Sequence, residues 1–322
     1  MKVLLIFLIL TVNLFAQVYS SPLAHTYSIV ARDEATGEMG AAVQSHWFSV
    51  GSLVIWGEAG VGVIATQSFV NPAFGPDGLK LLKEGLSAQE ALDKLIASDE
   101  ARDVRQLAIV DAMGGSAAYT GKNCIPAAGQ ITGENYSVQA NLMLNDKVWP
   151  AMSKAFTETK GRLADRLIAA LEAAQNEGGD IRGKQSAAIL IVKAKGSGKV
   201  WEDRIMDLRV EDHPEPVKEL KRLVQLHKAY EYMNNGDLAV EKGDMKKAME
   251  EYSSAENLFP ENEEMIFWHA VALANNKMID ESLPLFRKVF EMNENWKTLT
   301  PRLRKVGQLN ISDDQFQKIM EQ

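Results

Sequence analysis

The sequence predicts an α+β fold in which antiparallel sheets are covered by helices, followed by an all-α region. Three observations support this prediction. Short apolar segments of strand composition come in neighbouring pairs joined by Gly-containing turns. Amphipathic segments lie between these pairs in blocks, which is not the regular alternation of a doubly wound parallel sheet. Beyond residue 216 the chain is helical and charged throughout.

The segment 25–48 sets the pattern for the rest of the first half. Residues 26–32 have strand composition, and 39–46 form a second small, apolar strand. Between them lies the turn 33–37, which ends at Gly37, a residue that adopts positive φ without steric cost. We therefore expect a β-hairpin here.

The later strands and helices are predicted from composition and hydrophobic periodicity in the same way. Further strands are expected at 53–56, 61–67, 105–111, 116–120, 136–142, 187–193 and 200–209. A helix is expected over 79–98, with a break before Ser87 because Ser87 and Glu90 fit a capping box. Residues 148–175 are expected to form two helices that separate near Gly161.

Composition limits the class of protein. The chain has 322 residues, enough for two domains, and its 46% hydrophobic and 24% charged content is that of a globular protein. A net charge of −8 argues against a nucleic-acid binder. No GxGxxG or Walker motif is present, so we expect no cofactor. We expect no metal site either, because the five histidines are scattered, at 25, 46, 213, 227 and 269.

Residues 1–20 have the pattern of a secretory signal peptide. Lys2 is followed by the apolar run 3–15 and then by small or polar residues. The alternative is an uncleaved anchor helix, but the run is shorter than the roughly 20 residues that a membrane span needs. We therefore expect cleavage after Ala16 or Ser20, no membrane span in the mature chain, and export to the periplasm or the medium.

The C-terminal part reads as a separate helical domain, 217–322, after a linker at 212–216. Residues 241–262 and 275–296 align with each other at a spacing of 34. The matched positions are Ala248 with Ser282, Tyr252 with Phe286 and Ala255 with Val289. This pattern resembles tetratricopeptide repeats, which present a groove for a peptide or a partner helix. The alternative is a packing appendage without a partner.

The part before the linker resembles the family called domain of unknown function 1028. The matching pieces are TYSIVARDEATGEMGAAVQSHWFSVG (26–51), AGVGVIATQ (59–67), RQLAIVD (105–111), AAYTG (117–121) and EGGDIRGKQSAA (177–188). That family is similar in fold to the N-terminal-nucleophile (Ntn) hydrolases. The resemblance therefore implies a four-layer αββα sandwich over residues 21–211, with two stacked antiparallel sheets between helix layers. It brings no established substrate or reaction.

The resemblance also points to a catalytic residue. Ntn hydrolases attack an amide carbonyl with the side chain of an N-terminal Thr, Ser or Cys, and the α-amine of that residue serves as the base. Thr26, at the start of the first strand, is the corresponding position. Signal cleavage leaves Gln17 or Ser21 as the N-terminus, so Thr26 requires a second cut after His25. The alternative is that Thr26 is an ordinary strand residue.

Other polar residues near strand ends are candidates for the same site. His46 is a candidate general base, or it packs on Trp47. Asp180 and Arg182 would form a charged pocket wall that binds a substrate carboxylate, or only a salt bridge within their loop. Gln185 and Ser186 follow that loop and are expected to face the same cleft.

Amide side chains complete the list of candidates. Gln44 and Gln67 each lie at the polar end of a strand and are expected at the rim of the site. Asn141, Gln67 and Asn71 are candidates for an oxyanion hole, although such residues also cap loops.

Two hypotheses about function follow. The first is an exported Ntn-type amidohydrolase that acts on an amide bond in a small peptide, an amino-acid conjugate or a cell-wall fragment. The second is a non-catalytic module that binds a small-molecule or peptide ligand, with a protein partner docked on 217–322.

Overall fold

The computed structural model describes residues 23–322, so the predicted signal peptide and Ser21 lie outside the described residues. The chain divides into two compact units, one ending at Arg222 and one spanning Leu223–Gln322. This division falls within helix α8 (Pro216–Glu241), just after the predicted linker at 212–216.

The first unit contains two antiparallel sheets. The five-stranded sheet has the order β1 (Leu23–Ala24), β5 (Gly62–Phe69), β6 (Arg105–Asp111) and β7 (Ser116–Thr120), and β4 (Ile55–Glu58) also pairs with β5. The six-stranded sheet has the order β11 (Arg204–Val210), β10 (Ser186–Val192), β3 (Met39–Ser45), β2 (Thr26–Arg32), β9 (Tyr136–Ala140) and β8 (Gly129–Gly133).

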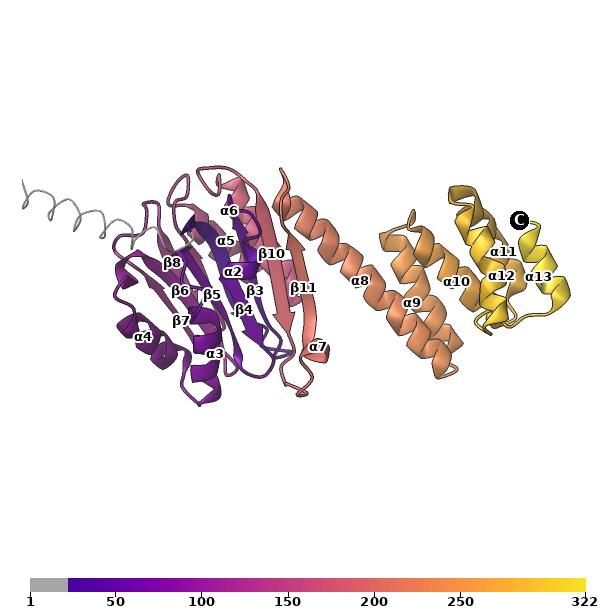
Figure 1. Ribbon diagram of the computed structural model, residues 1–322, viewed down its shortest axis with the longest axis horizontal. Helices are drawn as coiled ribbons and strands as arrows, with labels where there is room; N and C mark the ends of the chain where they lie inside the picture. Colours follow the sequence, from indigo (N-terminus) through magenta and orange to yellow (C-terminus); the bar gives the residue numbers. More distant parts are fainter. Residues whose placement is uncertain (1–22) are drawn as a thin grey trace, which may run out of the picture. The chain divides into compact units, whose positions relative to one another are not determined.

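Helices cover the outer faces of these sheets (Figure 1). Helices α3 (Phe74–Lys83) and α4 (Ala88–Ser98) pack on the five-stranded sheet. Helices α5 (Val148–Glu158) and α6 (Leu163–Asn176) pack on the six-stranded sheet. Short helical segments occur at α2 (Gly51–Val54), η1 (Arg102–Val104) and α7 (Val200–Asp203). The inner faces of the two sheets pack against each other.

Strand alternation separates the two faces of each sheet. In β6, Ala108 and Val110 point into an apolar core between the sheets, whereas Leu107 and Ile109 pack under α3 and α4. Val30, Ala41, Val43, Val63, Ala65, Leu190 and Val192 belong to the same inter-sheet core. This core occupies only part of the interface, because the inward positions nearer the start of β2 are polar.

The second unit is made of helices alone in its described residues. After α8 come α9 (Met245–Leu258), α10 (Glu263–Asn275), α11 (Ile279–Met292), α12 (Asn295–Lys305) and α13 (Asp313–Met320). Tyr252 in α9 and Phe286 in α11, which the sequence alignment equates, are both buried. Gly236 of α8 lies against the Tyr252 ring, where a Cβ would come within 2.5 Å of it. Tetratricopeptide character stays a prediction.

The structure confirms the predicted α+β class, the antiparallel pairing and the C-terminal helical region. The break before α4 is confirmed as well, because Ser87 and Glu90 form the expected capping box. No helix within residues 23–322 is long and apolar enough to cross a membrane.

Five local predictions were wrong or incomplete. The helix expected from residue 79 begins at Phe74. Residues 51–54 and 200–203 form short helices where strand residues were expected, at 53–56 and 200–209. Strands β1 and β8 were missed. β1 has only two residues, and β8 carries Gly at both ends, so neither has the residue pattern of a strand. Each is a strand because it pairs with a neighbouring strand, β1 with β5 and β8 with β9.

Candidate functional site

Thr26 begins β2 and is completely buried. Its hydroxyl donates a hydrogen bond to the carbonyl oxygen of Ala24. Its own carbonyl oxygen accepts hydrogen bonds from the backbone nitrogen of Asn141 at 3.1 Å and from Nε2 of Gln67 at 3.3 Å. While the His25–Thr26 peptide bond is intact, the Thr26 nitrogen is an amide and has no basic lone pair. The intact chain therefore lacks the amine that Ntn chemistry needs.

A layer of buried polar side chains, four amides and one hydroxyl, lies beside Thr26, between the two sheets. We call Ser28, Gln67, Gln106, Gln139 and Asn141 the amide layer; all five are 0% exposed. Ser28 Oγ donates to Gln67 Oε1 and accepts from Gln139 Nε2, both at 2.6 Å. Gln106 Oε1 accepts from Gln67 Nε2 at 2.6 Å and from Asn141 Nδ2 at 2.9 Å. The layer thus connects β2 and β9 of one sheet with β5 and β6 of the other.

Residues 23–25 cross from one sheet to the other directly before Thr26. Ala24 pairs with Ser68 in β5, whereas Thr26 pairs with Ser45 in β3. Ser68 has a φ of 74°, in the left-handed region that is costly for a residue other than glycine. The crossing segment therefore covers Thr26, and the strand with which it pairs, β5, has a strained backbone at Ser68.

His25 lies within this crossing and is 3% exposed. Its Nδ1 is 2.7 Å from Oδ1 of Asn141, and its ring meets the Phe69 ring edge-on at 5.4 Å between centroids. Burial lowers the pKa of His25, and the charge of Arg182 lowers it further. The hydrogen bond to Asn141 and the charge of Asp180 both act in the opposite direction. The buried site therefore favours the neutral form of the imidazole over the charged form.

Asp180 and Arg182 form a bidentate ion pair next to the same segment. Asp180 Oδ1 accepts from Arg182 Nε at 3.0 Å, and Oδ2 accepts from Arg182 Nη2 at 2.7 Å. The backbone nitrogen of His46 also donates to Asp180 Oδ2, at 3.1 Å, whereas the His46 side chain is exposed. Arg182 Nη2 donates to the carbonyl oxygen of His25 at 2.7 Å, and Ser45 Oγ donates to that oxygen at 2.6 Å. Two donors thus converge on the carbonyl of the peptide bond that precedes Thr26.

Gln44 lies on the opposite face of its sheet from Thr26. It pairs with Tyr27, whose hydroxyl donates to Gln175 Oε1 of α6 at 3.2 Å. Burial, and then the Asp180 charge, raises the pKa of Tyr27 well above its usual range. Neither polar atom of the buried Gln44 amide has a hydrogen-bond partner within residues 23–322. Gln44 is therefore placed away from the amide layer, because successive strand residues alternate faces.

The remaining predicted residues organise loops. Asn71 Oδ1 accepts from the Ala73 nitrogen at 3.2 Å, which caps the loop before α3. Ser186 Oγ accepts from the Val50 nitrogen at 3.1 Å and so holds the loop after β3. The carbonyl oxygen of Gln185 accepts from the backbone of the following linker. In residues 23–322, no three His, Cys, Asp or Glu side chains gather as metal ligands.

Comparison with known proteins identifies the first unit. DUF1028, described as a family of unknown function, matches residues 26–220. The chain belongs to this family. A solved DUF1028 protein from Silicibacter pomeroyi is 30% identical, with a TM-score of 0.57, over 63% of this chain and 85% of that one. The Anbu (ancestral beta-subunit) protein from Yersinia bercovieri is 14% identical, with a TM-score of 0.31, over 62% and 94%. None of the curated proteins matches the chain.

The DUF1028 domain therefore gathers Thr26, Gln67, Asn141, Asp180 and Arg182 around the crossing segment. Sequence reasoning missed other members of this arrangement, namely His25, Ser28, Gln106 and Gln139. A signal for several of them exists in the sequence. Polar residues alternate with apolar ones at 26 and 28 and at 137, 139 and 141, which is the period of a strand with one polar face.

Proposed function

We propose that the DUF1028 domain is the precursor of an Ntn-type amidohydrolase, in which a cut between His25 and Thr26 releases Thr26 as the nucleophile. The observation that carries this proposal is the His25 carbonyl oxygen, which accepts hydrogen bonds from Arg182 Nη2 at 2.7 Å and Ser45 Oγ at 2.6 Å. Donors placed on a carbonyl oxygen stabilise the negative charge that develops there during nucleophilic attack. The expected export is part of the same proposal.

The cut itself uses groups already present. The Thr26 hydroxyl oxygen bonds to the His25 carbonyl carbon, the carbon–nitrogen bond breaks, and the hydroxyl proton passes to the departing nitrogen. Arg182 and Ser45 hold the oxyanion during this step. Water then hydrolyses the ester, which leaves a carboxylate on His25 and a free amine and hydroxyl on Thr26.

The released Thr26 then has both groups that hydrolysis requires. An α-amine has a pKa of about 7.7, so near neutral pH part of it is unprotonated and can accept the hydroxyl proton. A substrate carbonyl would take the place of the His25 carbonyl, between Arg182 and Ser45. The acyl side chain would then occupy the space of the His25 ring, beside Asn141 and Phe69. We therefore propose that the substrate is an amide in a small peptide, an amino-acid conjugate or a cell-wall fragment.

Intact-mass measurement of the purified full-length chain during incubation tests the cut. We expect a product that begins at Thr26, none from Thr26→Ala, and slowing by about 100-fold in Ser45→Ala, the loss typical of one oxyanion donor. Thr157→Ala is the matched control, because Thr157 is an exposed helix residue and its loss should leave the cut unchanged. A chain that stays joined to residues before Thr26, with amidase activity unaffected by Thr26→Ala, would rule out the proposal.

The second candidate, a non-catalytic binding module, is favoured by the burial of Thr26 and by its hydroxyl donating to Ala24. In that case the chain stays intact and the helical part docks a protein partner. Pull-down with the full chain should then recover complexes that are lost on deletion of 217–322. Retention of every partner after this deletion would exclude the docking role.

A further inference from the structure

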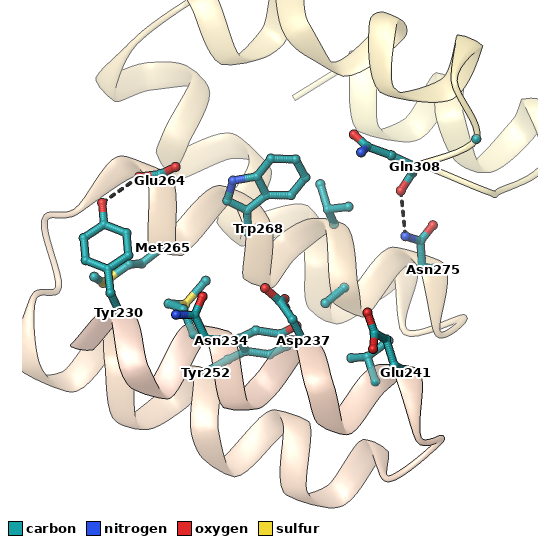
Figure 2. A pocket seen from close by; sticks show the side chains of 15 residues that line it. Tyr230, Asn234, Asp237, Glu241, Tyr252, Glu264, Met265, Trp268, Asn275 and Gln308 are labelled. Atoms are coloured by element: carbon teal, nitrogen blue, oxygen red, sulfur yellow. Dashed lines mark hydrogen bonds between the residues drawn. The ribbon is translucent and has the colours of Figure 1, made fainter. Parts of the chain in front are cut away.

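A groove of about 770 Å³ lies within the second unit, and Figure 2 shows it from close by. Its walls come from the C-terminal half of α8, from α10, and from the turn after α12 at Gly307 and Gln308. Tyr230, Asn234, Asp237 and Glu241 recur at helical spacing, so they form one stripe of α8 that faces this groove. We call it the helical groove. It is distinct from the proposed hydrolase site and does not depend on it.

The helical groove carries charge of one sign. Of its 15 lining residues, Asp237, Glu241 and Glu264 are carboxylates, and none is Lys, Arg or His. All three carboxylates lie on exposed residues. Glu241 forms no ion pair within residues 23–322. The groove therefore presents a negative field with no internal counter-charge, which favours a cationic occupant.

Tyrosine hydroxyls hold two of these carboxylates in place. Tyr252 donates to Asp237 Oδ1 at 2.7 Å, and Tyr230 donates to Glu264 Oε2 at 2.6 Å. Burial, and then the hydrogen bond and charge of Asp237, raises the pKa of Tyr252, so this phenol keeps its proton. Two of the carboxylates are thus fixed before any ligand arrives, which lowers the entropy cost of ordering these side chains on binding.

The groove also offers aromatic and apolar surface. Trp268 is half-buried, and it lines the same groove as Asp237 (Figure 2). Met233, Met265 and Val271 supply apolar lining. An indole face beside a carboxylate suits a guanidinium, which stacks on a ring while its edge donates to oxygen.

We propose that the helical groove binds an arginine-containing segment of a partner protein, with the guanidinium between Trp268 and Asp237. The apolar stem of the arginine and neighbouring aliphatic side chains would contact the methionines. A segment of a few residues fits the volume of the groove, and the charge complementarity selects it over an acidic or neutral one.

Fluorescence anisotropy of the full-length chain tests this with a labelled peptide amide, Gly-Ala-Leu-Arg-Leu-Arg-Ala. We expect saturable binding that weakens with salt. The same peptide with citrulline in place of arginine keeps the shape and loses the charge, and it should not bind. Asp237→Asn with Glu241→Gln keeps the acceptor for Tyr252 and should weaken binding about tenfold or more.

The matched control is Glu250→Gln with Glu291→Gln, which removes the same charge from exposed positions outside the groove. Circular dichroism would establish that both double variants stay folded. Four outcomes would overturn the proposal: no binding of the arginine peptide, equal binding of the citrulline peptide, no effect of the groove variant, or an equal loss in the control.

Discussion

At the scale of single residues, His25 connects the parts of the candidate site. Its ring reaches Asn141 of the amide layer, and its carbonyl oxygen accepts from Arg182 and Ser45. Its backbone carbonyl also forms the peptide bond that keeps the Thr26 nitrogen an amide. The sequence identifies Thr26 through a family resemblance, but it gives no sign that His25 would be buried, because a lone histidine before a strand is compatible with either environment.

The lowered pKa of His25 predicts a pH dependence of stability. Unfolded His25 binds a proton below its ordinary pKa of 6.5, whereas the folded chain resists protonation until lower pH. The free energy of unfolding of the first unit should therefore be highest above this pH and should fall as pH decreases below it. Urea unfolding at a series of pH values between about 7.5 and about 5.5 measures this.

His25→Gln should remove that part of the pH dependence. The carboxyls with lowered pKa, such as Asp99 and Glu90, do not interfere, since they titrate below their ordinary pKa values of 3.8 for Asp and 4.5 for Glu. An identical pH dependence in the variant and the parent chain would contradict the assignment to His25.

At the scale of elements, the strands with strong local patterns were predictable to the residue. Residues 105–111 and 116–120 are examples, because apolar composition and flanking turns coincide there. Strand β8 was not predictable, since between its two glycines it contains only Gln130, Ile131 and Thr132, and its pairing with β9 supplies the rest. The amide layer is a tertiary feature. Alternation indicates which residues share a face, but it cannot tell that two polar faces meet.

Gln106 should be the most costly member of the amide layer to replace. Gln106→Leu leaves the donors of Gln67 and Asn141 and the carbonyl of Ala140 without this partner, so the free energy of unfolding should fall by about 3 kcal/mol or more. Gln89→Leu is the matched control, because Gln89 is exposed on α4, and it should change stability by less than about 0.5 kcal/mol. Equal effects of the two variants in urea unfolding would show that the layer contributes little.

At the scale of the whole molecule, the two units have separate hydrophobic cores. One set of apolar clusters lies in the DUF1028 domain, and another lies among the helices that follow. The family match ends at residue 220, close to the division at Arg222. We therefore expect each unit to unfold in its own cooperative transition.

Two helix caps allow this to be tested by calorimetry. Ser87 and Ser312 each form a capping box, at the start of α4 and of α13. Ser87→Ala should lower the stability of the first unit by about 1 kcal/mol and leave the transition of the second unit in place. Ser312→Ala should lower the stability of the second unit by about 1 kcal/mol and leave the transition of the first unit in place. A single transition that shifts equally in both variants would contradict separate unfolding.

The amide layer also has an evolutionary consequence. Its side chains are joined by hydrogen bonds between specific donors and acceptors, so a change at one position alone leaves a donor or an acceptor of the neighbouring side chain without a partner. Among relatives, positions 67, 106, 139 and 141 should therefore be inherited as a set and should covary when they change.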